Sequence, residues 1–139
     1  MDAVAATYLA ERLRINRTPI CIHVATRLLN AFPELINTLQ TEVVVSPEKR
    51  MAEVSAERLC ELVRAMLLFN LPILADKELE WACSVLSRNG ITSMHQTALI
   101  RWFFDEVRLL DLSADEVAIT QELEQYMLDV LDRLYKLKR

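Results

Sequence analysis

Apolar residues recur three or four positions apart along most of this chain, with polar residues between them. This spacing predicts amphipathic helices that each bury one face. Asp2 stands just before the first such pattern and can cap a helix that runs to about Asn16. One face of that helix is expected to carry Val4, Tyr8, Leu9 and Leu13.

A second helix is predicted over 20–31. The Thr18-Pro19 pair is a start signal, because a capping hydroxyl is followed by a proline that suits the first helical position. The Phe32-Pro33 pair ends the helix, since the residue before a proline avoids the α conformation. A shorter helical segment is expected over 34–41. The apolar stripe of the second helix comprises Ile20, Val24, Leu28 and Leu29.

The middle of the chain repeats the start signal at 46–48, where Ser-Pro-Glu precedes a long helical pattern. This pattern allows either one helix over 47–70 or two helices with a kink between them. The valines at 43–45 are the only β-like run, and their shortness favours a connection over a strand. Pro72 lies just beyond the expected end of the helix. The second half of 47–70 is strongly apolar, with Leu59, Leu62, Val63, Met66 and Leu67.

Three further helices are expected in the remaining part of the chain. Asp76 opens the first, which closes at Gly90, because glycine suits the left-handed residue that follows a helix end. Thr92 caps the second, which extends to about Leu110. A capping box at 113–116 starts the third and longest. Its stripe comprises Ile119, Leu123, Tyr126, Val130, Leu134 and Leu137.

Together these patterns predict an all-α, single-domain bundle of seven to eight helices over residues 1–139. The links are short, and neither a repeat nor a linker divides the chain. The last two helices should pack as an antiparallel pair, because only two or three residues are expected between them. Gly90 is the only glycine. Its isolation disfavours Gly-rich phosphate loops, nucleophile elbows and β-sandwiches.

Charge and cysteine content bear on location and partners. The net charge of −4 disfavours binding to the phosphate backbone of nucleic acids. The most apolar run, residues 65–75, is too short to span a bilayer. The first residues lack the basic region of a signal peptide. The three cysteines form no CxxC pair, which favours buried thiols. We therefore expect a cytoplasmic protein with neither nucleic acid nor membrane as a partner.

Candidate chemistry is sparse. His23 and His95 lie far apart in the sequence, and neither has a second ligand at a spacing typical of metal sites. Serine and cysteine residues occupy helix caps or apolar stripes without a base placed beside them. We therefore expect no metal site and no catalytic centre, and a binding protein is favoured over an enzyme.

The aromatic residues offer a further candidate surface. Trp102, Phe103 and Phe104 span most of the circumference of one helix, so their three rings cannot all face one core. One ring should point outward or toward a partner subunit. Core packing is the simplest interpretation of this set together with Trp81, and a ligand pocket is the alternative.

From about Ile20 onward, the order of the helices resembles the globin superfamily. The segment Phe32-Pro33-Glu34-Leu35 is similar to the Phe-Pro-Glu-Leu that closes an early globin helix. A long apolar helix, a shorter helix, the Gly90 turn and two long helices follow. Haem globins carry their iron-binding histidine shortly before this glycine, where this chain has Val85-Leu86-Ser87-Arg88. The resemblance therefore implies a globin-like bundle that does not bind haem in the usual way.

Among haem-free relatives, the chain resembles the globins associated with bilin biosynthesis and the phycobiliproteins. Sensor globin domains of bacterial stress-signalling complexes come second. The stretches 71–76 and 86–92 look like the phycobiliprotein region with its Ala-Gly-Asp and Leu-Gly-x-Pro turns. Phycobiliproteins attach bilin through a Cys-x-Arg-Asp motif, whereas Cys60 is followed by Glu-Leu-Val. The resemblance thus implies a non-covalent bilin in place of a covalently attached one.

The expected pocket lies between the helices over 55–70 and 76–89. Its occupant is expected to be a bilin, another apolar ligand or a protein partner, in a bilin-related or regulatory role. The alternative is a dimeric helical adaptor, or a stress-sensor globin domain, without a small-molecule ligand. The resemblance implies a homodimer for both. The expected ligand-binding residues are Cys60, Leu62, Arg64, Met66, Trp81, Val85 and Trp102.

Overall fold

The computed structural model describes residues 1–35, 55–88 and 90–137. Within these ranges the chain is all-helical, as the sequence predicts, and contains no strand. The six described helices are fewer than the seven to eight expected. The additional segments, 34–41 and the first part of 47–70, lie largely outside the described residues. The helices are α1 (Ala3–Ile15), α2 (Arg17–Ala31), α5 (Glu57–Phe69), α6 (Leu74–Ser87), α7 (Ser93–Arg108) and α8 (Ala114–Leu137).

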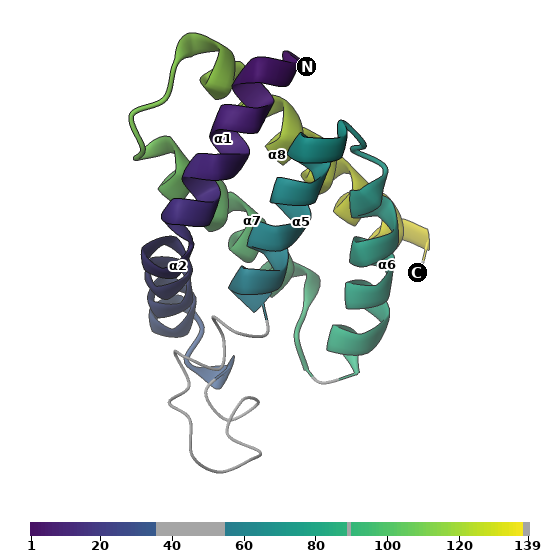
Figure 1. Ribbon diagram of the computed structural model, residues 1–139. Helices are drawn as coiled ribbons and strands as arrows, with labels where there is room; N and C mark the ends of the chain where they lie inside the picture. Colours follow the sequence, from purple (N-terminus) through teal and green to yellow (C-terminus); the bar gives the residue numbers. More distant parts are fainter. Residues whose placement is uncertain (36–54, 89, 138–139) are drawn as a thin grey trace.

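The helices pack in two layers. α1 contacts α5, α2 contacts α7, and α8 contacts both α6 and α7. In Figure 1, α1, α5 and α6 stand in the foreground, and α7 and α8 pass behind them. α7 and α8 are antiparallel, as expected, because Gln96 contacts Tyr135 whereas Arg108 contacts Glu124. The link between them, residues 109–113, is longer than expected because α7 already ends at Arg108.

The core lies between the two layers and is built mainly from aliphatic and aromatic side chains. Phe103 and Phe104 are both buried, with ring centroids 5.3 Å apart in an edge-to-face arrangement. Trp102 is the ring that leaves the core. Its indole stacks on Phe32 and lies under the guanidinium of Arg27, 4.5 Å from the ring centroid. The prediction that the three rings do not all face one core is therefore confirmed, but Trp102 is half-buried at the edge of the core and does not project outward.

Three helix starts carry the caps that the sequence predicts. The Asp2 carboxylate accepts a hydrogen bond from the backbone N–H of Ala5 at 2.9 Å. The Thr92 hydroxyl accepts from the N–H of His95, whose ring in turn accepts from the N–H of Thr92. Ser113 and Glu116 bond reciprocally, each side chain to the other's backbone N–H. These local interactions satisfy N–H groups that have no partner within the helix.

Two predicted helix starts lie too late in the sequence, by three residues for α2 and by two for α6. α2 begins at Arg17, directly after Asn16, which also ends α1. Thr18 therefore lies inside the first turn and does not cap it, and Pro19 is tolerated there because its position needs no N–H donor. α6 begins at Leu74, so Asp76 lies within its first turn.

The expected apolar face of α1 is only half correct. Leu9 and Leu13 are buried against the other helices, whereas Val4 and Tyr8 are each 66% exposed. Successive helical residues are rotated by about 100°, which places Val4 and Tyr8 on the side away from the buried stripe. Within the described part of the chain, no helix is both long and apolar enough to cross a membrane.

Gly90 closes the turn between α6 and α7. Its φ of 80° lies in the left-handed region that glycine enters without steric cost. The N–H of Ile91 donates to the carbonyl of Leu86 at 3.0 Å, which completes a helix-ending motif of the kind the sequence predicts. This turn delivers the first residues of α7 to the end of α6.

Candidate functional site

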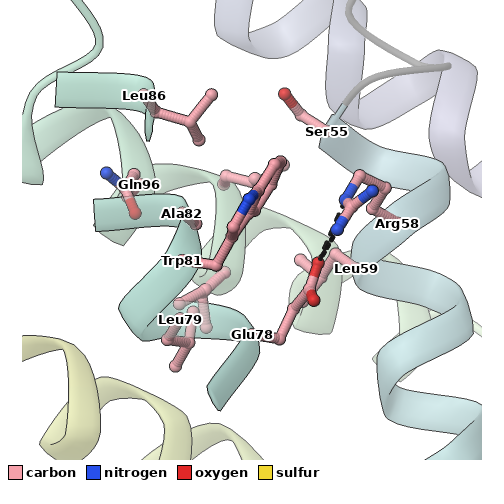
Figure 2. Close-up of a pocket in the computed structure, with 11 residues that line it drawn as sticks. Ser55, Arg58, Leu59, Glu78, Leu79, Trp81, Ala82, Leu86 and Gln96 are labelled. Carbon is pink, nitrogen blue, oxygen red and sulfur yellow. Dashed lines mark hydrogen bonds and ion pairs between the residues drawn. The ribbon is translucent and has the colours of Figure 1, made fainter. Parts of the chain in front are cut away.

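A small apolar groove opens where α5, α6 and α7 meet (Figure 2). Residues of α6 form one side of it, residues at and just before the start of α5 form the other, and α7 supplies the floor. The carbon-rich lining gives it the character of a site for an apolar group. It is lined by Ser55, Arg58, Leu59, Glu78, Leu79, Trp81, Ala82, Leu86, Gln96, Leu99 and Ile100.

Trp81 and Arg58 face each other across the rim of the groove. The Arg58 guanidinium lies 4.3 Å from the centroid of the Trp81 ring, and its Nε donates to the Glu78 carboxylate at 3.0 Å. Arg58 is thus held between an aromatic face and a carboxylate. Trp81 remains 44% exposed, so a large part of the indole is open to contact.

One polar side chain, Gln96, reaches the floor of the groove. It is buried, and its Nε2 donates to the hydroxyl of Tyr135 on α8. Its Oε1 accepts a weak hydrogen bond from the Cys83 thiol at 4.0 Å. Tyr135 also contacts the Ser87 hydroxyl at 3.4 Å. Gln96 is thereby held in place by partners on α8 and α6, with both ends of its side-chain amide engaged.

Burial raises the pKa of the Tyr135 hydroxyl, which gives a prediction about alkaline pH. Because the pKa of Tyr135 is higher in the folded chain than in the unfolded one, its neutral hydroxyl contributes to the free energy of unfolding. This contribution is complete below about pH 10. It is lost as the pH rises through the raised value. We expect Tyr135→Phe to lose less thermal stability above about pH 10 than the wild type does. Thermal unfolding across this pH range measures the difference, with the exposed Tyr8→Phe as a matched control. An identical alkaline loss in Tyr135→Phe and wild type would contradict the prediction.

The groove is small. Its cavity volume of about 70 Å³ is well below the roughly 300–1,000 Å³ of typical small-molecule pockets. In this conformation it has room for part of one apolar side chain and not for a whole tetrapyrrole.

Only one of the seven expected site residues lines the groove, namely Trp81. Cys60 and Met66 are buried in the core on other sides of α5. Arg64 points to α1, where its Nε donates to the carbonyl of Ala10 at 3.1 Å. The remaining three also lie elsewhere. Leu62 lies beside Arg17 and Glu61 on the outer side of α5. Val85 is half-buried on α6, and Trp102 lies between α2 and α7.

The sequence analysis placed one α7 residue, Trp102, at the expected pocket, but it missed the three α7 residues that line the groove. Gln96, Leu99 and Ile100 form the floor, and apolar residues at this spacing were assigned to the core. The one available signal was Gln96 itself, a polar residue four positions before Ile100 on a stripe that is otherwise apolar.

Both histidines have carboxylate neighbours. The Nδ1 of His95 accepts from the Thr92 N–H at 3.0 Å, and its Nε2 lies 3.1 Å from the Glu34 carboxylate. His23 lies 3.3 Å from Glu106 on the surface between α2 and α7. Among the residues that the structure describes, no three His, Cys, Asp or Glu side chains gather as a metal site would require.

Comparison of the chain with family models, with curated proteins and with solved structures finds no match. The resemblance to globins therefore rests on the order of the helices and on the segment from Phe32 to Leu35.

Proposed function

We propose that this chain is a haem-free, globin-like helical protein that acts by binding, without catalysing a reaction. Its ligand is a protein partner, which inserts an apolar side chain into the groove between α5, α6 and α7. The observation that carries this proposal is the groove itself, with an apolar lining, a half-exposed Trp81 at its rim and room for part of one apolar side chain.

The chemistry of the rim favours a protein over a small molecule. Tryptophan and arginine are enriched among the residues that dominate binding energy at protein interfaces. Here Trp81 and Arg58 already stack on each other, so little side-chain freedom is lost when a partner covers them. The small volume disfavours a bilin, which needs a much larger cavity.

The proposal can be tested with displayed random peptides selected on the immobilised protein. Peptides that bind carry a fluorescent label and are titrated with the wild type and with each variant by fluorescence anisotropy. In Trp102→Phe, Trp81 is the only remaining tryptophan, and its own fluorescence reports on the groove. We expect the selected peptides to share one apolar residue. Trp81→Ala should weaken the binding of these peptides about 30-fold, which is the effect of losing a central contact worth about 2 kcal/mol. Circular dichroism checks that each variant remains helical.

Two results would contradict the proposal. Peptides that bind Trp81→Ala as tightly as wild type, or that share no apolar residue, would show that the groove is not the binding site. If the absorbance of biliverdin shifts on mixing with the wild type but not with Trp81→Ala, the ligand of the groove is a tetrapyrrole and not a protein partner.

A second candidate function is self-association, and a different surface favours it. The α5–α6 corner carries the exposed apolar side chains of Leu68, Phe69, Leu71 and Ile73. No charged residue occurs between positions 65 and 75. Two copies of a chain with a net charge of −4 can approach most easily through such an uncharged patch, and a two-fold axis would place each corner on the other.

Sedimentation velocity at micromolar concentration tests this second candidate. We expect a dimer for the wild type and a monomer for Phe69→Glu, because Phe69 is 68% exposed and the new charges would face each other. Leu109→Glu is the matched control, since Leu109 is 80% exposed but lies at the end of α7. A monomeric wild type would contradict self-association and leave the groove proposal untouched.

A further inference from the structure

The imidazole of His95 joins the start of α7 to the segment that follows α2. His95 is only 5% exposed, and its Nδ1 accepts a hydrogen bond from the backbone N–H of Thr92 at 3.0 Å. Its Nε2 lies 3.1 Å from an oxygen of the Glu34 carboxylate. The ring also packs edge-to-face on Phe32, with 4.7 Å between the ring centroids. One buried ring thus contacts two parts of the chain that are far apart in the sequence.

These contacts fix the position of the imidazole proton. A backbone N–H can only donate, so the Nδ1 atom that faces Thr92 carries no proton. The proton of the neutral ring is therefore on Nε2, which donates it to Glu34. His95 occupies the third position of α7, where a capping box more often has glutamate or glutamine. Unlike glutamine, histidine can gain a second proton near physiological pH.

A second proton on His95 is incompatible with this arrangement. It would have to sit on Nδ1, so two donors would face each other and the cap of α7 would be lost. The positive end of the α7 dipole and the burial of the ring also disfavour a cation at this position. The Glu34 carboxylate would attract the imidazolium, but its side chain is 60% exposed, and such screened pairs contribute little to stability. The losses therefore outweigh the gain.

The other charged and titratable groups around this ring come from each element that packs on it. The backbone N–H of Glu34 and then the contact with His95 hold the pKa of the Glu34 carboxyl below its ordinary value, so this carboxylate stays ionised at weakly acidic pH. On α2, Arg27 lies over Trp102 and is paired with an aspartate of α7. The nearest titratable group of α8 is the neutral hydroxyl of Tyr135. Histidine is thus the side chain of this cluster whose ordinary titration falls between pH 5 and 8.

We propose that His95 is a pH-sensitive latch, which holds residues 32–34 on the start of α7 when it is neutral and releases them when it is protonated. Release separates Phe32 from the indole of Trp102, on which it stacks with 5.9 Å between the ring centroids. The latch therefore uncovers one face of Trp102 at weakly acidic pH. The change is local, because Leu35 and the rest of the core are buried among other side chains and stay in place.

The experiment uses the full chain with Trp81→Phe, in which Trp102 is the only tryptophan. We expect its fluorescence emission maximum to move to longer wavelength between pH 7.5 and pH 5, because water reaches the uncovered indole face. Circular dichroism of the same samples should remain that of a helical protein. In the wild type at pH 7.5, the nitrogen chemical shifts of the His95 ring should identify a protonated Nε2 and an unprotonated Nδ1.

Two histidine variants, each made in the Trp81→Phe chain, separate the latch from a general effect of acid. His95→Gln keeps a side-chain acceptor for the N–H of Thr92 and takes up no proton in this range, so the emission shift should disappear. His23→Gln removes the other histidine of the sequence and should leave the shift unchanged. The proposal is overturned if the shift persists in His95→Gln, if the parent chain shows no shift, or if the neutral His95 ring carries its proton on Nδ1.

Discussion

Truncating Phe103 to alanine should lower the free energy of unfolding by about 3–5 kcal/mol. Phe103 is fully buried between the two layers and packs edge-to-face on Phe104. Alanine would remove most of the side chain and leave a cavity that the surrounding helices can fill only in part. A loss of this size is a large fraction of the roughly 5–15 kcal/mol that stabilises a typical domain.

Urea unfolding followed by circular dichroism measures this loss. Leu109→Ala is the matched control, because it removes an apolar side chain near the end of the same helix at an exposed position. We expect the control to change the free energy of unfolding by no more than about 0.5 kcal/mol. A loss below about 1 kcal/mol for Phe103→Ala would mean that the ring is not in a tightly packed core.

Replacing Arg12 by methionine should lower the free energy of unfolding by about 2–3 kcal/mol, because it leaves the buried carboxylate of Glu116 without its cation. Arg12 on α1 lies 3.4 Å from Glu116 at the start of α8, and it also donates to the carbonyl of Asp111. Within the described residues, the Oε2 atom of Glu116 is buried and makes no hydrogen bond. The estimate is below that for a fully buried pair because Arg12 is partly exposed.

The matched background for this test is Glu116→Gln, which keeps the side-chain oxygen that accepts from the N–H of Ser113 and removes the charge. In that background we expect Arg12→Met to lower the free energy of unfolding by less than about 1 kcal/mol. Equal costs in the two backgrounds would show that Arg12 stabilises the fold through its contact with Asp111 and through packing, and not through the ion pair.

The parts of the fold that sequence predicted well depend on neighbouring residues. Asp2, Thr92 and the box at 113–116 cap helices through bonds to N–H groups three positions away. Gly90 takes a backbone conformation that few other residues tolerate. Such features need only a short stretch of chain, so a short stretch of sequence is enough to find them.

The errors arise where distant parts of the chain meet. Apolar residues on α1 fall on two sides of the helix, and only packing against α5 decides that Leu9 is buried while Tyr8 is exposed. Five of the expected site residues, Cys60, Leu62, Arg64, Met66 and Val85, lie on α5 and α6 but do not line the groove. Periodicity identifies an apolar face and does not tell which of its residues border an opening. Trp81 is the one expected residue that does line the groove, although core packing is the simplest interpretation of it from sequence.

The junction at Asn16 has a consequence for the groove, although it lies outside it. One residue separates α1 from α2, and these two helices brace α5 and α7 respectively. α5 forms one side of the groove and α7 its floor, so the one-residue junction links the helices that pack against these two parts. We expect a single-residue insertion at Asn16 to change the spacing between α5 and α7 without replacing any side chain that lines the groove. The width of the groove should therefore depend on a junction that lies outside it.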